Sequence, residues 1–190
     1  MLDRKPMILV LAGPNGSGKS TITQYFDKVG SYTNADDVVA TIGISNEKAA
    51  ILVDQKRYKS IDNKEDFTFE TVLSSNYKLK ILEKAKQEGY FIKCIFVLTI
   101  DPLINVSRVE MRVASGGHDV DKKKIIERYY KSLNNIKVLM ELCDILHVYD
   151  NTIEPTRIIR KHKNDISIFP NRLWSEEQIM NLLEWILPIL

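Results

Sequence analysis

The segment from Gly13 to Thr21 has the residue types and spacing of a phosphate-binding loop. It satisfies the pattern G-x-x-x-x-G-K-[ST] at every fixed position. Glycine lets backbone N–H groups curl around an anion, and the positive end of the following helix adds to the attraction. We therefore expect a nucleotide to be bound by Gly13, Pro14, Asn15, Gly16, Ser17, Gly18, Lys19, Ser20 and Thr21.

Within this loop, two side chains have distinct expected tasks. Lys19 can reach the β- and γ-phosphates, and the Ser20 hydroxyl can be a ligand of Mg²⁺. An apolar run precedes the loop and a helix-compatible segment follows it, which is the strand–turn–helix context that the motif requires. ATP and Mg²⁺ are the cofactors that this pattern predicts.

Short apolar runs alternate with longer segments of helical period, which is typical of an α/β fold with a mainly parallel sheet. In such sheets, ligands bind at the carboxyl ends of the strands. We predict a five-stranded P-loop NTPase sheet, flanked by helices, with a helical lid at about 102–142 and a small C-terminal hairpin and helix. The expected strands are 6–12, 32–34, 67–70, 91–99 and 145–149, the hairpin is 156–169, and the helices are 19–28, 46–60, 76–88, 102–115, 121–142 and 175–187.

Length and composition set limits on the kind of protein. A chain of 190 residues with 44% hydrophobic content can bury one core, so we expect a single domain over 1–190. The net charge of +2 predicts no broad basic surface for nucleic acid. Two cysteines without metal spacing, no signal peptide and no membrane-spanning length favour a cytoplasmic protein.

Three other motifs have to be weighed against the P-loop. Residues 63–66 match the N-K-x-D guanine motif, but they follow a polar helix instead of an apolar strand. Residues 115–118 resemble part of a transporter-ATPase signature, but no apolar strand with an Asp-Glu pair follows. Asp101 ends an apolar run as a metal-binding Asp would, yet Asp101-Pro102 is equally typical of a helix N-cap, which we favour. A small-molecule kinase remains.

Such a kinase needs a carboxylate near the γ-phosphate. Asp36 follows the second predicted strand and can accept a hydroxyl proton from the acceptor, although capping a helix is an equal alternative. Glu70 ends the next strand, where it either binds substrate hydroxyls or faces water. We favour substrate binding by Glu70 and by the neighbouring Thr71.

A kinase also needs cations that cover the transferred phosphoryl group. Arg108 and Arg112 lie four residues apart and share one helix face. Gly116 and Gly117 then interrupt that helix, and Arg128 follows in the next one. A helix, a glycine loop and a return helix can form a lid, and the guanidinium fork suits phosphoryl oxygens.

Together these blocks resemble the compact branch of the zeta toxin family. The resemblance rests on the P-loop, Asn34-Ala35-Asp36, Phe69-Glu70-Thr71, the arginine block that runs into Gly116-Gly117-His118-Asp119-Val120, Glu127-Arg128-Tyr129-Tyr130 and Asp150-Asn151. It extends over about three quarters of the chain. Asp121 and Glu127 depart from the pattern of compact relatives, in which a proline and a second arginine stand at these places.

The resemblance implies a kinase that phosphorylates the 3′-hydroxyl of UDP-N-acetylglucosamine with ATP, with an antitoxin protein as partner. It implies that Asp36 is the catalytic base, Glu70 a substrate ligand, and Arg112 and Arg128 phosphate-stabilising side chains. Arg108 and Asn151 would bind the nucleotide, and Asn34 and His118 the substrate. The alternatives are a polynucleotide or nucleoside kinase and a non-catalytic ATP-binding interaction module.

Overall fold

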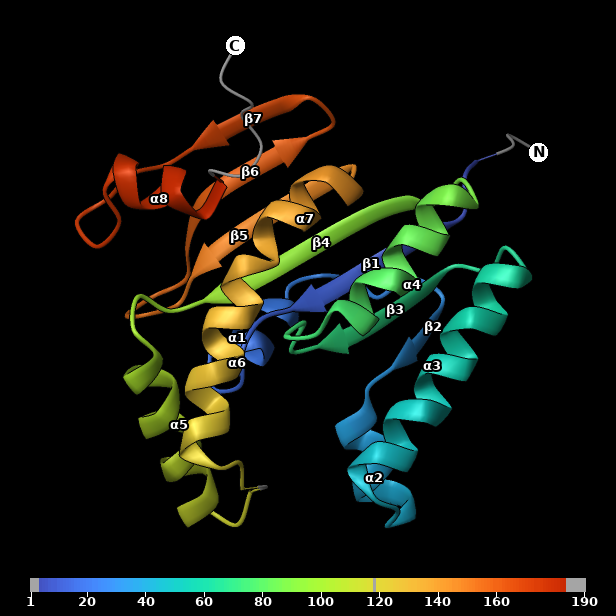
Figure 1. The fold of residues 1–190 in the computed structure, drawn as a ribbon, viewed down its shortest axis with the longest axis horizontal. Coiled ribbons are helices and arrows are strands. Elements are labelled where there is room, and N and C mark those ends of the chain that lie inside the picture. Colours follow the sequence, from blue (N-terminus) through green and yellow to red (C-terminus); the bar gives the residue numbers. More distant parts are fainter. Residues whose placement is uncertain (1–3, 118, 184–190) are drawn as a thin grey trace.

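The computed structural model describes residues 4–117 and 119–183, which form a mixed α/β fold around one sheet (Figure 1). Its strand order is β2-β3-β1-β4-β5-β6-β7. The first five strands in this order are parallel, and β6 and β7 extend the sheet in antiparallel fashion beyond β5. The strands are β1 (Met7–Ala12), β2 (Ser31–Thr33), β3 (Phe67–Thr71), β4 (Phe91–Leu98), β5 (Ile145–Asp150), β6 (Thr156–His162) and β7 (Asp165–Ile168).

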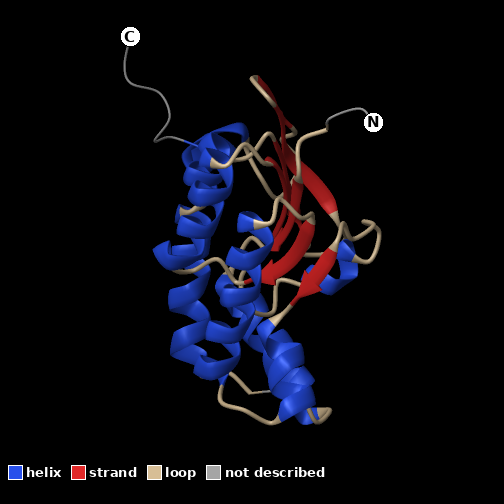
Figure 2. Ribbon diagram, turned by 90° about the vertical axis from the view of Figure 1, so that its right-hand side faces the viewer, coloured by secondary structure: helices blue, strands red, loops and turns tan. Residues whose placement is uncertain are grey.

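Most helices cover one face of this sheet, and the short helix α1 lies against the other, as Figure 2 shows edge-on. The larger core joins apolar side chains of α3, α4, α7 and α8 to that first face. The second, smaller core contains Ile22 of α1 with alternate residues of β1 and β4. The helices are α1 (Lys19–Thr23), α2 (Ala35–Ile42), α3 (Asn46–Asp62), α4 (Asn76–Gln87), α5 (Pro102–Ala114), α6 (Lys122–Asn134), α7 (Ile136–Leu142) and α8 (Glu176–Leu183).

The predicted fold class is confirmed, with differences in particular elements. The hairpin strands join the main sheet, so the described sheet has seven strands. The predicted helix 121–142 is divided at Asn135, and the predicted helix 19–28 already ends at Thr23. Helix α2 was not predicted. Asn34 caps it by accepting a hydrogen bond from Asp36 N at 3.1 Å, and Gly43 ends it with φ of 72°.

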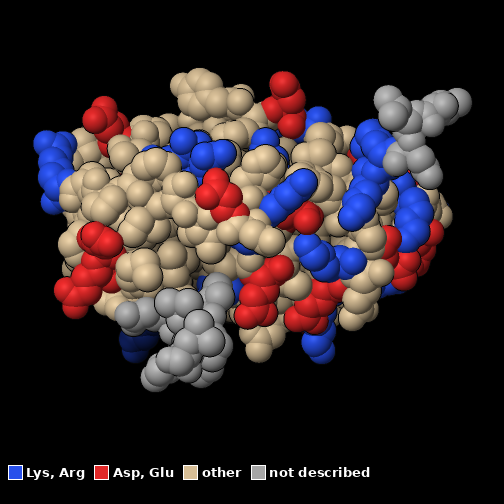
Figure 3. Space-filling view, turned by 90° about the horizontal axis from the view of Figure 1, so that it is seen from above, with Lys and Arg blue, Asp and Glu red and all other residues tan. Residues whose placement is uncertain are grey.

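The surface agrees with the balanced composition. On the face seen in Figure 3, acidic and basic side chains are scattered among uncharged residues, and neither sign forms a continuous surface. Among the described helices, none is both long enough and apolar enough to cross a bilayer. The predicted helix 175–187 begins at Glu176, and its part beyond Leu183 lies outside the described residues.

Candidate active site

The P-loop connects β1 to α1 in a conformation that depends on its glycines. Gly16 and Gly18 have φ of 76° and 77°, values that other residues rarely adopt. A β-carbon on Gly16 would lie 2.3 Å from the carbonyl oxygen of Asn105, because α5 packs directly against the loop. The Asn105 amide in turn donates a hydrogen bond to Asn15 O at 2.7 Å. Asn105, near the start of the predicted lid, therefore holds the loop through close backbone packing and one side-chain hydrogen bond.

Lys19 is directed back over the loop. Its ammonium donates hydrogen bonds to Gly13 O at 3.0 Å and to Pro14 O at 3.4 Å, and it lies 3.9 Å from Glu70 Oε1. Burial lowers the pKa of Lys19, while Glu70 and Asp36 act in the opposite direction. The cation thus lies between the loop carbonyls and the two carboxylates predicted to bind the acceptor.

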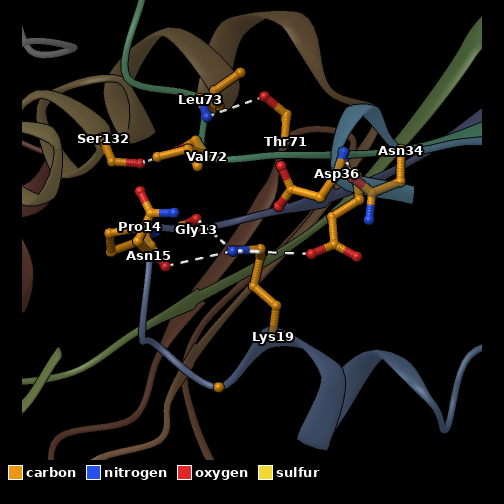
Figure 4. A network of polar contacts seen from close by, with 12 residues as sticks. Gly13, Pro14, Asn15, Lys19, Asn34, Asp36, Thr71, Val72, Leu73 and Ser132 are labelled. Atoms are coloured by element: carbon orange, nitrogen blue, oxygen red, sulfur yellow. Dashed lines mark hydrogen bonds and ion pairs between the residues drawn. The ribbon is translucent and has the colours of Figure 1, made fainter. Parts of the chain in front are cut away.

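Asp36 lies in the first turn of α2 and shares a cavity with the P-loop. Figure 4 shows the side chains of Asp36 and Lys19 directed toward the same space from α2 and α1. Because Asn34 supplies the side-chain cap of α2, the alternative in which Asp36 only caps a helix does not hold. Asp36 is exposed and free to meet a ligand, and its role as base stays a prediction.

The shared cavity has a volume of about 280 Å³. Cationic side chains outnumber carboxylates in its wall, which suits an anionic ligand. The wall combines the P-loop, the start of α2, the end of β3 and the two lid helices. Its residues are Asn15, Gly16, Lys19, Asn34, Ala35, Asp36, Ala50, Arg57, Glu70, Thr71, Val72, Leu73, Ser74, Ser75, Lys78, Arg112 and Arg128.

Glu70 and Thr71 are held at the end of β3, as the sequence predicts. The Tyr32 hydroxyl donates a hydrogen bond to Glu70 Oε2 at 3.2 Å, and burial raises the pKa of this tyrosine. Thr71 Oγ1 accepts a hydrogen bond from Leu73 N at 3.0 Å, which fixes a turn in which Leu73 has φ of 54°. These contacts orient both side chains toward the cavity that also contains Lys19.

The three predicted lid arginines divide into two groups. Arg112 and Arg128 line the cavity, and Arg128 Nη1 lies 3.4 Å from Asn15 Oδ1 of the P-loop. Arg108 does not line it, because its guanidinium donates to Asn151 O at 2.8 Å and to Thr152 O at 3.0 Å. The helix pair α5 and α6 therefore extends the site over the loop with two of the three guanidinium groups.

Asn151 lies behind the P-loop. Its amide donates to Ser17 O at 3.0 Å, and a β-carbon on Gly18 would lie 2.1 Å from the Asn151 nitrogen. Asn151 and Arg108 together brace the loop, and their predicted contact with the nucleotide stays a prediction. His118, predicted to bind substrate, lies outside the described residues.

Two motifs singled out in the sequence have structural roles. Asp101 caps α5 by accepting a hydrogen bond from Leu103 N at 2.7 Å, as favoured from the sequence. In the guanine-like motif, Asp66 accepts from Met7 N at 2.8 Å at the start of β1, so it lies at the end of the sheet opposite the P-loop. Lys64 of the same motif pairs with Glu88 at 2.5 Å.

A buried ionic network in the cavity wall was missed by sequence reasoning. Arg57 of α3 is 2% exposed and donates to Thr33 Oγ1 at 2.9 Å, to Thr33 O at 3.2 Å and to Glu70 O at 3.4 Å. It also pairs with Asp54 at 2.8 Å, whose other oxygen lies 2.5 Å from Lys78 Nζ. Burial lowers the pKa of both Arg57 and Lys78, and the shared carboxylate opposes this effect.

A signal for this network was present in the sequence. Val53, Arg57 and Ile61 recur every four residues on α3, so the arginine falls within the buried stripe of that helix. A guanidinium in such a stripe must find several acceptors. The strand acceptors are Thr33 at the end of β2 and the carbonyl of Glu70 near the end of β3, and Asp36 lies three residues after Thr33.

Comparison with known proteins gives a consistent result. The sequence model of a family described as Zeta toxin matches residues 32–173, about three quarters of the chain, beginning within β2 and therefore after the P-loop and α1. A Haemophilus influenzae protein described as uncharacterized is 28% identical over 123 residues, which are 62% of this chain and 88% of that protein.

Two solved structures share the fold at low sequence identity. The structure described as AvrRxo1-ORF1:-ORF2 with ATP matches 99% of this chain and 66% of that chain, with a TM-score of 0.72 and 12% identity. The structure of the PezAT chromosomal toxin–antitoxin system of Streptococcus pneumoniae matches 96% of this chain and 89% of that chain, with a TM-score of 0.63 and 14% identity. This chain thus spans about two thirds of the length of the AvrRxo1 relative.

Proposed function

The chain belongs to the zeta toxin family, and on this premise we propose that it is an ATP- and Mg²⁺-dependent kinase that phosphorylates a hydroxyl group of a small polar acceptor. The observation that carries the proposal is the single cavity in which Lys19 of the P-loop, Asp36 of α2 and the lid arginines meet. A nucleotide-binding loop alone would not require a carboxylate opposite its lysine. The segment 102–142 then acts as a lid within a single domain.

In the proposed reaction, the acceptor hydroxyl gives its proton to Asp36 as its oxygen attacks the γ-phosphorus of ATP. The bond between that phosphorus and the β,γ-bridging oxygen breaks, and ADP leaves with the bonding electrons. Lys19, Arg112 and Arg128 neutralise the charge on the phosphoryl oxygens during transfer, which is where most of the rate enhancement in such enzymes arises. Glu70 and Thr71 hold the acceptor at the end of β3.

Ser20 is the residue that would hold Mg²⁺. It lies in the first turn of α1 with an exposed side chain, which leaves room for the waters and phosphate oxygens that Mg²⁺ prefers. Among residues 4–117 and 119–183, no cluster of three His, Cys, Asp or Glu side chains forms a complete protein site. A donor set of one hydroxyl plus substrate oxygens fits Mg²⁺, and the bound ion supplies charge neutralisation on the phosphates.

We further propose a sugar nucleotide as acceptor, with UDP-N-acetylglucosamine as the first candidate. Support comes from the family resemblance and from the polar acceptor end of the cavity, formed by Glu70, Thr71, Ser74, Ser75 and Lys78. Incubation with labelled ATP and a panel of UDP-sugars, nucleosides and 5′-hydroxyl oligonucleotides tests this directly. Transfer to an oligonucleotide would indicate a polynucleotide kinase, and no transfer to any acceptor would favour a non-catalytic module.

The decisive test of the site is the substitution Asp36→Asn. We expect nucleotide affinity to stay unchanged and phosphoryl transfer to fall by about 10²–10⁴-fold, the usual contribution of a positioned acid–base group. Asp37→Asn is a matched control, because Asp37 is an exposed carboxylate of the same helix turn that does not line the cavity. Equal rates of phosphoryl transfer for the wild type and Asp36→Asn would show that Asp36 is not the base.

An antitoxin protein is a further proposed partner. Support comes from the PezAT relative, which is described as a toxin–antitoxin system. Co-expression with the product of an adjacent small gene should yield a stable complex in size-exclusion chromatography. Separate elution of the two proteins would argue against this partner.

A further inference from the structure

The sheet face opposite the main helices carries a cluster of cationic side chains beyond the cover of α1. Strand pairing places Arg160 of β6 opposite His147 of β5, and Arg157 opposite Tyr149. Lys93 of β4 lies on the same face, since its neighbours Ile92 and Cys94 point into the main core and Ile95 into the smaller one. We define the β4–β6 face by these five residues.

The cations of the β4–β6 face have no acidic partner among residues 4–117 and 119–183. Among the described residues, Lys93, Arg157 and Arg160 take part in no ion pair. Burial lowers the pKa of His147 to about 4, and the charges of Arg157, Lys93 and Arg160 act in the same direction. Asp165 pairs with His162 at the edge of the sheet, and Asp150 follows Tyr149 on β5 but is buried.

Two hydrogen-bonding groups on the same face lack partners. Arg157 Nε and His147 Nδ1 are both buried from solvent and have no hydrogen-bond partner among the described residues. Buried polar atoms are normally satisfied, and those that are not often belong to sites completed by a ligand. The Nε atom of Arg157 and the Nδ1 atom of His147 are thus two unsatisfied polar atoms of this face.

Aromatic rings accompany the cations. Lys93 Nζ lies 5.3 Å from the ring centroid of Phe26, and the Arg157 guanidinium lies 5.3 Å from that of Phe169, which is 37% exposed. Tyr149 packs edge-on against Phe26 with centroids 6.4 Å apart. The five residues that define the face are half-buried. Cations beside aromatic rings on a sheet are the features with which proteins bind single strands, through phosphate contacts and base stacking.

From these observations we propose that the β4–β6 face binds single-stranded nucleic acid, with Lys93, Arg157 and Arg160 on phosphates and the rings of Tyr149 and Phe169 against bases. An acidic peptide would pair with the cations, but its carboxylates would make no stacking contact with the aromatic rings. Three strands span only about 10 Å, so the face accommodates a few nucleotides and is too narrow for a duplex footprint. The site is separate from the ATP cavity, so it does not depend on the proposed kinase activity.

The sequence expectation of no nucleic-acid binding rested on overall charge. The cations of this face come from positions 93, 157 and 160, which are brought together only by the pairing of β4, β5 and β6. A local cluster of this kind is compatible with a net charge of +2. It predicts modest, salt-dependent affinity and not the tight binding of a dedicated regulator.

Fluorescence anisotropy with a labelled 12-nucleotide oligouridylate and the full chain tests the proposal. We expect a dissociation constant of about 10 µM at low salt, and a slope of log K against log salt of about −2, as three phosphate contacts require. The triple variant Lys93→Gln/Arg157→Gln/Arg160→Gln should bind at least about tenfold more weakly, with a slope near zero. A single charge reversal, Arg160→Glu, gives the same direction of change if the triple variant folds poorly.

Matched controls locate the binding. The variant Lys48→Gln/Lys59→Gln/Lys80→Gln removes the same charge from exposed positions on α3 and α4 and should bind as the wild type does. Lys19→Ala should also leave oligonucleotide binding unchanged, because the P-loop is not part of this face. The proposal is overturned if oligouridylate does not bind, if both triple variants weaken binding equally, if Lys19→Ala abolishes it, or if a polyglutamate peptide binds more tightly than oligouridylate does.

Discussion

Replacing Arg57 by methionine tests whether the buried network positions the site. The guanidinium makes four hydrogen bonds, two to Thr33, one to Asp54 and one to Glu70 O, and it is 2% exposed. Methionine keeps an unbranched apolar side chain without charge, although it is shorter than arginine by the outer part of the guanidinium. The substitution therefore removes the polar contacts and leaves Asp54 and the strand ends to find other partners.

The expected loss of stability depends on the charge of Asp54, which stays buried after the substitution. Removing one partner of a buried ion pair costs about 3–5 kcal/mol, because the other charge is left uncompensated. Lys78 still pairs with the second oxygen of Asp54 at 2.5 Å, so the lower end of that range applies. We predict a loss of about 3 kcal/mol in the free energy of unfolding, which a domain of this size tolerates.

Urea unfolding, followed by tryptophan fluorescence, measures this loss. With a slope of about 2 kcal/mol per molar urea, the midpoint should fall by about 1.5 M. Lys59→Met is the matched control, because Lys59 is an exposed cation on the same helix, and its midpoint should stay within about 0.3 M of the wild type. A midpoint shift below about 0.5 M for Arg57→Met would refute the assigned role of the network.

Two further predictions concern single residues. Gly18→Ala should lower the free energy of unfolding by about 1 kcal/mol more than Gly43→Ala does, and it should weaken nucleotide binding. Both glycines have positive φ, but only Gly18 is crowded, by Asn151. Equal losses of stability in urea unfolding and an unchanged ATP affinity by calorimetry would contradict this prediction. His147 has a folded pKa of about 4, so the unfolded chain binds the extra proton and stability falls as pH drops from about 6.5 to 4. His147→Gln should remove about 1–2 kcal/mol of that acid destabilisation, after allowance for solvent screening, and an unchanged pH dependence of unfolding in this variant would contradict the reasoning.

The sequence predicted those parts of the fold that depend on local patterns. The strand before the P-loop, the glycine turn and the capped start of α5 at Asp101 each follow from a few adjacent residues, and all are present. The carboxyl-end rule placed Asp36 and Glu70 at one edge of the sheet, and both line one cavity. Local chemistry and parallel topology together were sufficient for these positions.

Features that depend on distant contacts were not predicted. Asn34 is predicted to bind substrate, yet its side chain also caps α2, a role that the sequence offered only to Asp36. Arg57 is buried because the ends of β2 and β3 supply acceptors, and no pattern within α3 shows those acceptors. Arg108 and Asn151 contact each other across 43 residues, so neither spacing nor charge could show that they brace the loop.

The end of α6 and its junction with α7 are tied by hydrogen bonds to the loop that follows β3. Ser132 donates a hydrogen bond to Val72 O, and the Asn135 amide donates to Leu73 O at 2.8 Å. Any swing of α6 must therefore either break these bonds or drag the loop after β3 with it. A ligand that moves α6 would then also move the loop after β3, which lines the proposed acceptor end of the cavity. The affinities for ATP and for the proposed acceptor should therefore be thermodynamically linked, even though the two molecules touch mostly different residues.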